Sequence, residues 1–146
     1  IIFTMPNADH ESKIIFKEIN NFVKKNKNST VFKSLGSLTY LSCLKFVDII
    51  VGNSSSGLLE APTLKTPTIN IGERQDGRLK AKSITDCPPK KKEIVRNIKK
   101  VLRNKGKFNK SYFKSPYGTI GASKKIISIL EKKSFNNLLK KTFYDL

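Results

Sequence analysis

The stretch Asp48–Pro62, which reads DIIVGNSSSGLLEAP, decides the fold of this chain. Residues 48–51 are typical of a buried strand, residues 53–56 form a loop of small polar side chains, and a short apolar segment with helical spacing follows. Ligands of open α/β sheets bind beyond the carboxyl ends of the strands. A loop there that opens a helix offers N–H groups and the positive end of the helix dipole to an anion. We therefore expect a site for a phosphorylated ligand.

Strands alternate with helices along the rest of the chain. The patterns predict strands at 1–4, 30–33, 48–51, 68–71 and 83–86, and helices at 9–25, 38–46, 57–64, 90–104 and 120–133. This alternation indicates an α/β fold, a Rossmann-like parallel sheet with helices on both faces. We expect one domain over 1–133 and a C-terminal helical tail over 134–146. The chain opens on a strand without an initiator Met, so we expect it to be part of a longer protein.

The strong positive charge has two interpretations. The formal net charge is +18, but only four of the 29 basic residues are arginines. Arginine is the side chain best suited to bidentate recognition of phosphates and bases. A lysine-rich composition spread over every segment is more typical of a solvated basic surface, although a functional basic patch that binds nucleic acid stays open. We expect no specific nucleic-acid partner.

Other features narrow the class of protein. No apolar run approaches the ~20 residues that span a bilayer, so we expect no membrane segment. Cys43 and Cys87 lie far apart without metal or redox spacing, which favours a reducing, cytoplasmic location. The single histidine, His10, excludes a site built on several histidines of this chain. We expect neither a metal nor a cofactor.

The remaining chemistry lies in the serine loop, one carboxylate and one guanidinium. The chain has neither a Walker phosphate loop nor a GxGxxG fingerprint. Glu60 follows the serines by about one helical turn, and a carboxylate there can accept both hydroxyls of a ribose. Arg74, in the loop after strand 68–71, would supply positive charge at the same edge. These groups describe a nucleotide-diphosphate site, but an ordinary turn with a surface glutamate fits them equally well.

Three motifs resemble the hydrolysing UDP-N-acetylglucosamine 2-epimerases. They are FTMPNAD at 3–9, GNSSSGLLEAP at 52–62 and PTINIGERQDGR at 67–78, in the order and at the distances of that family. Non-hydrolysing epimerases usually carry a loop of the Asp-Ser-Gly-Gly type where this chain has Asn-Ser-Ser-Ser. The resemblance implies the C-terminal half of a two-domain enzyme of the GT-B type, with the active site in the cleft between its domains.

The resemblance also implies roles for individual residues. Ser54 and Ser55 match the positions that hold the diphosphate, and Glu60 matches the carboxylate on the ribose. The remaining matches are Arg74 and Asn7 at the nucleotide, and Leu35 and Gly36 where loop backbone meets the uracil.

In this family UDP is eliminated from the sugar, and water adds to the resulting glycal to give N-acetylmannosamine for sialic-acid-like sugars. The resemblance implies a UDP-sugar substrate, a homodimer of the full-length protein, and acid and base groups in the N-terminal domain. It therefore implies that the present chain binds nucleotide without turning over substrate. A GT-B glycosyltransferase half and a basic nucleic-acid-binding module are the alternatives.

Overall fold

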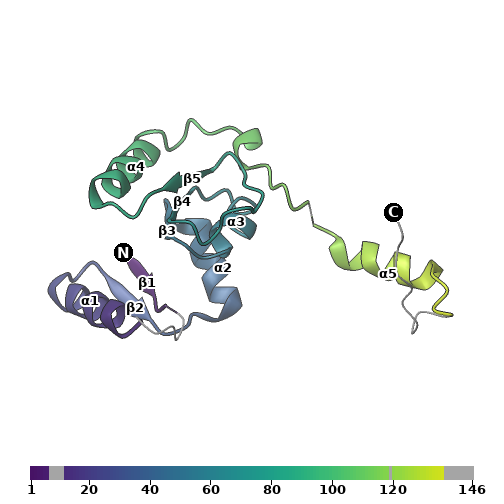
Figure 1. The fold of residues 1–146 in the computed structure, drawn as a ribbon, viewed down its shortest axis with the longest axis horizontal. Helices are drawn as coiled ribbons and strands as arrows, with labels where there is room; N and C mark the ends of the chain where they lie inside the picture. The colour runs from purple at the N-terminus through teal and green to yellow at the C-terminus, as the bar shows by residue number, and fades with distance from the viewer. Residues whose placement is uncertain (7–11, 119, 137–146) are drawn as a thin grey trace.

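The computed structural model describes residues 1–6, 12–118 and 120–136 of an α/β fold (Figure 1). Each predicted strand and helix has a counterpart in this part of the chain. The strands are β1 (Ile2–Thr4), β2 (Thr30–Phe32), β3 (Ile50–Gly52), β4 (Thr68–Ile71) and β5 (Ile84–Cys87). The helices are α1 (Ser12–Lys25), α2 (Gly36–Phe46), α3 (Ser56–Leu59), α4 (Lys91–Arg103) and α5 (Ala122–Lys132), with a 3-10 turn at Lys110–Phe113.

The strands are parallel and form two ladders, with helices on both sides (Figure 1). β1 pairs with β2, and β4 lies between β3 and β5, with Ile50 opposite Thr68 and Thr68 opposite Ile84. Residues of β1 and β3 line the same cavity of about 200 Å³, and no residue of β2 does. The ladders β2–β1 and β3–β4–β5 therefore lie with β1 facing β3 without pairing, and the direction of winding reverses at the crevice between them.

β4 is the central strand of the larger ladder, and its sequence explains its position. Thr68, Ile69 and Asn70 are all buried, which fits a strand covered on both faces. Helices α3 and α4 both contact β4. The buried apolar side chains of the described residues are Leu44, Leu58, Ala61, Ile69, Ala81, Cys87 and Val101. The core is therefore gathered around β4, next to the serine loop.

Helix α3 is shorter than the predicted 57–64. It ends at Leu59 and continues as turns to Lys65. Pro62 has no N–H to donate to the carbonyl four residues earlier, and it restricts the residue before it, so a regular helix cannot run through this point. Only one helical turn therefore follows the serines.

Gly57 allows α3 to approach β4 closely. A Cβ at this position would lie 2.6 Å from Cγ2 of Thr68. The hydroxyl of Thr68 donates to the carbonyl of Gly57 at 2.9 Å, and both residues are buried. The serine turn is therefore fixed directly on the central strand.

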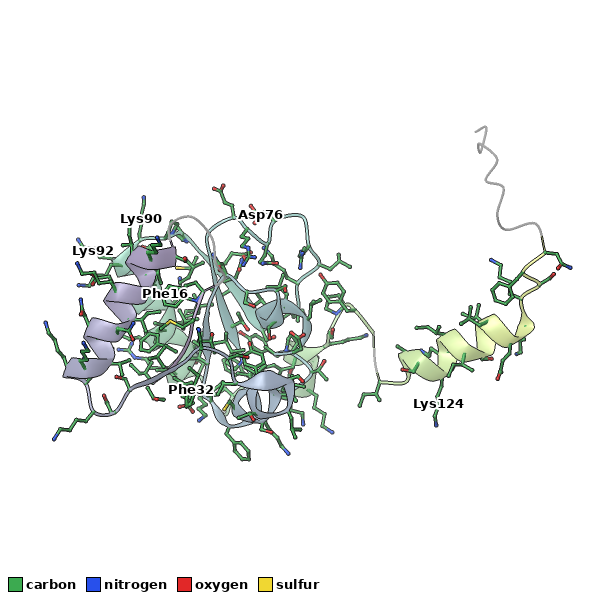
Figure 2. All side chains as sticks on the ribbon, turned by 90° about the horizontal axis from the view of Figure 1, so that it is seen from below. Phe16, Phe32, Asp76, Lys90, Lys92 and Lys124 are labelled. Carbon is green, nitrogen blue, oxygen red and sulfur yellow. The ribbon has the colours of Figure 1, made fainter. Side chains whose placement is uncertain are left out.

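A charged network joins the carboxyl ends of β4 and β5. The amide of Asn70 donates to Asp86 at 2.7 Å, and the ammonium of Lys80 donates to both carboxylate oxygens of Asp86 at 2.8 Å. Asp76, which projects from the loop after β4 (Figure 2), lies 3.7 Å from Lys80. These contacts tie the β4–β5 connection to the edge of the sheet.

The network shifts the pKa values of two of its members in opposite directions. Burial raises the pKa of Asp86, but the hydrogen bonds from Lys80 and Asn70 outweigh it and hold the pKa below its ordinary 3.8. The hydrogen bond to Asp86 raises the pKa of Lys80 above its ordinary 10.5. Both shifts favour the charged forms, as expected for an ion pair.

Helix α5 extends away from the α/β body (Figure 1). Its isoleucines at 126, 127 and 129 are exposed, as is Leu130. The predicted helical tail over 134–146 lies mostly outside the described residues. Among the residues described, no helix combines the length and the apolar character needed to cross a membrane.

We predict that Gly57→Ala destabilises the fold by about 1–3 kcal/mol, because the new methyl group overlaps the Thr68 side chain. Chemical unfolding of the variant measures the loss. Thr68→Ser removes the obstructing methyl and keeps the hydroxyl donor, so the double variant should lose less stability than the two single variants combined. Strict additivity of the two losses would contradict this contact.

A second prediction concerns pH. Lys80→Met should lower the free energy of unfolding at pH 7 by less than about 1 kcal/mol, because the pair is partly exposed to solvent. The pKa of Asp86 is depressed in the folded state, so its contribution is present above the ordinary pKa and is lost as the pH falls through the folded value. The difference between the variant and the unsubstituted chain should therefore begin to shrink below about pH 4 and disappear only at a pH below the folded pKa of Asp86. If the two free energies of unfolding still differ by the same amount at low pH, Asp86 is not the group through which Lys80 stabilises the fold.

Candidate functional site

The candidate site is a cavity of about 470 Å³ at the carboxyl ends of three strands. Met5 and Pro6 follow β1, Asn53 and Ser54 follow β3, and Arg74 lies in the loop after β4. All three segments line this one cavity. It lies at the reversal point of the strand order, where open α/β sheets bind their ligands.

A second cavity, of about 390 Å³, adjoins the first. Leu35, Gly36 and Ser54 line it together. Thr4, Tyr40 and Ser54 line both cavities. The two are therefore parts of one depression, and Ser54 lies where they meet.

Side chains and backbone of the turn hold the serines in place. The hydroxyl of Ser54 accepts the N–H of Ser56 at 3.3 Å, and the phenol of Tyr40 donates to the hydroxyl of Ser56 at 2.7 Å. The N–H of Gly57 donates to the carbonyl of Ser54 at 3.1 Å. α3 is a single turn, so its dipole is much weaker than that of a full helix. Anion binding in the depression must therefore rest mainly on hydroxyl groups and on the two basic side chains that line it, Arg74 and Lys33.

Arg74 supplies the positive charge of the cavity. Its side chain is exposed, and it makes no salt bridge with any residue in the described part of the chain. Gly72, at the start of its loop, has φ +75°, a left-handed conformation that favours glycine. The loop after β4 thus brings a guanidinium without a salt bridge among the described residues to the same cavity that Ser54 lines.

Three predicted residues have no demonstrated place in these cavities. Ser55 and Glu60 line neither of the two, although Ser55 precedes α3 and Glu60 directly follows it. One carboxylate oxygen of Glu60, Oε2, is buried and has no hydrogen-bond partner among the described residues. A buried acceptor without a donor is costly and is common at functional sites. Asn7 lies outside the described residues.

Two residues of the site were not predicted from the sequence. Tyr40 lines both cavities and holds Ser56, and Gln75 donates to the carbonyl of Asn53 at 2.7 Å. The sequence contained one weak signal for each: a phenol within an otherwise apolar helix, and a neutral amide in a charged loop. Neither signal shows that the side chain turns towards the serine loop.

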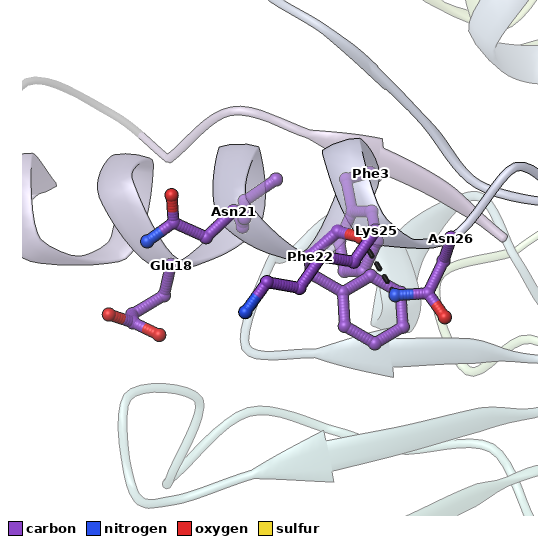
Figure 3. A pocket seen from close by; sticks show the side chains of 7 residues that line it. Phe3, Glu18, Asn21, Phe22, Lys25 and Asn26 are labelled. Atoms are coloured by element: carbon purple, nitrogen blue, oxygen red, sulfur yellow. Dashed lines mark hydrogen bonds between the residues drawn. The ribbon is translucent and has the colours of Figure 1, made fainter.

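A further cavity of about 430 Å³ lies between α1 and β1 (Figure 3). The rings of Phe3 and Phe22 meet there edge to face, with centroids 5.6 Å apart. The amide of Asn26 donates to the carbonyl of Phe22 at 2.8 Å. The ring contact packs α1 against β1, whereas the hydrogen bond lies at the C-terminal end of α1 itself.

A cluster of basic side chains lies on one face of α4. Arg96, Lys99, Lys100 and Arg103 line a cavity with Asn104, and of these only Arg96 pairs with an acidic group of the described chain, Glu93. This face shares no lining residue with the serine-loop cavities. Among the described residues, basic side chains thus line both a crevice and a separate helix surface.

Comparison with known proteins identifies the family of the chain. The UDP-N-acetylglucosamine 2-epimerase family matches residues 1–131. A Campylobacter jejuni protein named GDP/UDP-N,N'-diacetylbacillosamine 2-epimerase (hydrolyzing) is 46% identical over 59% of the chain and 23% of its own length. The Escherichia coli polysialic acid biosynthesis protein P7 is 45% identical over 66% of the chain and 25% of its own length. A Neisseria meningitidis UDP-N-acetylglucosamine 2-epimerase is 33% identical over 74% of the chain and 28% of its own length.

The chain spans about a quarter of the length of these relatives. The match covers the serine loop, Arg74 and every strand. It confirms the resemblance carried by the three sequence motifs and agrees with the α/β architecture. The chain belongs to the UDP-N-acetylglucosamine 2-epimerase family.

Proposed function

We propose that this chain is the nucleotide-binding part of a hydrolysing UDP-N-acetylglucosamine 2-epimerase. The observation that carries the proposal is the single cavity lined by Ser54 and Arg74, from two different loops, at the reversal point of the strand order. Hydroxyl donors beside an unpaired guanidinium suit a diphosphate. The family match supports the same ligand class.

Each predicted site residue has a role in this proposal. Ser54, Ser55 and Arg74 bind the diphosphate, and Leu35 and Gly36 contact the base through their backbone. Glu60 accepts hydrogen bonds from the ribose hydroxyls. Its buried Oε2 has no hydrogen-bond partner among the described residues and is therefore available as the acceptor. Asn7 completes the nucleotide site. Ser55 and Glu60 must become accessible to the ligand, since neither lines the cavities.

The proposed reaction begins with removal of the C2 proton of the sugar by a base. The electron pair of that C–H bond forms the C1–C2 double bond, the bond from C1 to the phosphate oxygen breaks, and UDP leaves with its electron pair. Water then adds its oxygen to C1, and C2 receives a proton on the face opposite the one from which its proton was removed. The product is N-acetylmannosamine. Negative charge grows on the diphosphate as it leaves, so donors aimed at it lower the barrier.

Ser54, Ser55 and Arg74 are the groups of this chain that would stabilise the leaving diphosphate. We expect the acid and base groups to come from the remainder of the longer protein, since the relatives are about four times as long as the matched segment. On this proposal the chain binds nucleotide but does not turn over substrate by itself.

The biological setting is part of the proposal. The name of the Escherichia coli relative, a polysialic acid biosynthesis protein, supports a role in making sialic-acid-like sugars. The Campylobacter relative is named for a diacetamido sugar and for either GDP or UDP, so both nucleotides belong in any test. Cys43 and Cys87 are free thiols, which supports the proposed cytoplasmic location. The homodimer of the full-length protein stays a prediction.

We predict that the chain binds UDP and that Arg74→Ala weakens binding by about 1–3 kcal/mol, because the diphosphate loses a charged partner. Glu60→Ala should have an effect of similar size through the ribose hydroxyls. Calorimetric titration at moderate salt measures both losses. Arg96→Ala is the matched control, because it removes the same charge from the α4 face and should leave UDP affinity unchanged.

The alternatives give different results in the same titration. A preference for GDP over UDP would change the assigned base while keeping the diphosphate site. Tight, salt-sensitive binding of a short DNA duplex, weakened by Arg96→Ala and accompanied by no UDP binding, would replace the proposal with a nucleic-acid-binding function. Sugar transfer to an acceptor by the longer protein, without release of N-acetylmannosamine, would assign it to a glycosyltransferase.

A further inference from the structure

Gln75 is almost fully buried in the loop that carries Arg74. Its side chain is 3% exposed, whereas Arg74 and Asp76 on either side of it are exposed. A neutral amide therefore turns inward between two charged side chains that face solvent. Burying a polar side chain is unfavourable unless it forms hydrogen bonds. The amide nitrogen has a partner, whereas Oε1 is buried and has none among the described residues.

The amide of Gln75 joins two loops. Its Nε2 donates to the main-chain carbonyl of Asn53 at 2.7 Å, across 22 positions of sequence. The acceptor is a carbonyl, which can only accept, so the nitrogen must face it. Asn53 directly precedes Ser54, and Gln75 directly follows Arg74. One hydrogen bond thus connects the neighbours of the two residues proposed to bind the diphosphate.

The loop after β4 has freedom that this bond would restrict. Gly72 and Gly77 both adopt positive φ, +75° and +76°, and Gly77 lies two residues beyond Gln75. Ordering flexible backbone on binding costs free energy, and a site whose loops are already ordered avoids that cost. Gln75 does not line the cavity that Ser54 and Arg74 share. It can affect a ligand there only through its neighbours.

We propose that Gln75 is a positioning residue, which holds Arg74 and the serine loop at the spacing that a nucleotide diphosphate requires. The inference rests on the proposed function, because it concerns the same cavity. A residue that merely fills space would affect the stability of the fold and leave the contribution of Arg74 to binding unchanged. If Gln75 is a positioning residue, the effect of its substitution on UDP affinity depends on the presence of Arg74. If it only fills space, that effect does not depend on Arg74.

A double-variant comparison separates these roles. Gln75→Met keeps the length of the side chain and removes the hydrogen bond. UDP affinity is measured by titration of backbone amide NMR signals for the unsubstituted chain, Gln75→Met, Arg74→Ala and the double variant. We expect Gln75→Met to weaken UDP binding about fivefold in the unsubstituted background, as for a lost hydrogen bond, and less than twofold when Arg74 is already alanine.

Thr66→Val is the matched control. Thr66 is 2% exposed and its hydroxyl donates to the carbonyl of Leu44, at the other end of β4 from the site. The control also loses one buried hydrogen bond, so its stability should fall by an amount comparable to that of Gln75→Met. Its UDP affinity should stay within twofold of the unsubstituted chain.

The outcomes distinguish the two claims. Absence of UDP binding by the folded, unsubstituted chain would overturn the proposed function, and the role of Gln75 with it. If the unsubstituted chain binds UDP and Gln75→Met does not weaken that binding, only the role of Gln75 is overturned. The same holds if Gln75→Met weakens binding equally with Arg74 and with alanine at position 74.

A second measurement needs no substitution, in case Gln75→Met does not fold. The side-chain amide protons of Gln75 should exchange with solvent at least several-fold more slowly when the chain is saturated with UDP, because the ligand holds both loops together. An exchange rate unaffected by UDP, in a chain that binds UDP, would also contradict the positioning role.

Discussion

The contact between Gly57 and Thr68 determines where the serine turn lies. β4 is buried on both faces, and the turn after β3 reaches it without an intervening side chain because position 57 has no Cβ. The Thr68 hydroxyl satisfies the Gly57 carbonyl at the same point. A polar loop is thereby fixed to the most buried strand of the domain. The hydroxyl of Ser54 is presented to the crevice as a consequence of core packing.

From this fixed turn the site extends by hydrogen bonds from neighbouring elements. α2 contributes the phenol of Tyr40, and the loop after β4 contributes the amide of Gln75. The Asn70–Lys80–Asp86 network secures the far side of that loop at the ends of β4 and β5. The strand ends form the edge of the sheet at which the site lies, and these side chains hold the loops in position there. This division is common in α/β proteins, where functional loops are positioned by a rigid sheet.

Sequence patterns located the strands and helices well, because each is a short apolar block bounded by turn residues. The run Thr68–Ile71 was predicted with the bounds that the structure gives it. The length of α3 was overestimated, since the spacing of apolar residues continues past Pro62 and the hydrogen bonding of the helix does not. The pattern also does not show that the strands pair as two ladders, because pairing depends on side chains far apart in sequence.

The residues of the candidate site were predictable from the sequence where a side chain that can bind phosphate directly follows a predicted strand. Ser54 and Arg74 both follow strands, so the alternation predicted them at the same edge of the sheet. The structure adds that they line one cavity. Gln75 and Tyr40 were missed, because sequence spacing does not reveal which way a loop or helix side chain turns. The net charge of +18 was equally ambiguous. In the structure one cluster of positive charge lies on α4, and the candidate crevice is lined by Arg74 in one of its cavities and by Lys33 in the other.

The central claim is that a nucleotide diphosphate binds in the crevice between β1 and β3. Mapping the backbone amide signals that shift when UDP is added to the isotopically labelled chain tests this location most directly. The account predicts shifts concentrated in residues 33–40, 52–60 and 72–76, with the α4 face at 96–104 unaffected. Shifts concentrated on α4, with the serine loop unchanged, would contradict it.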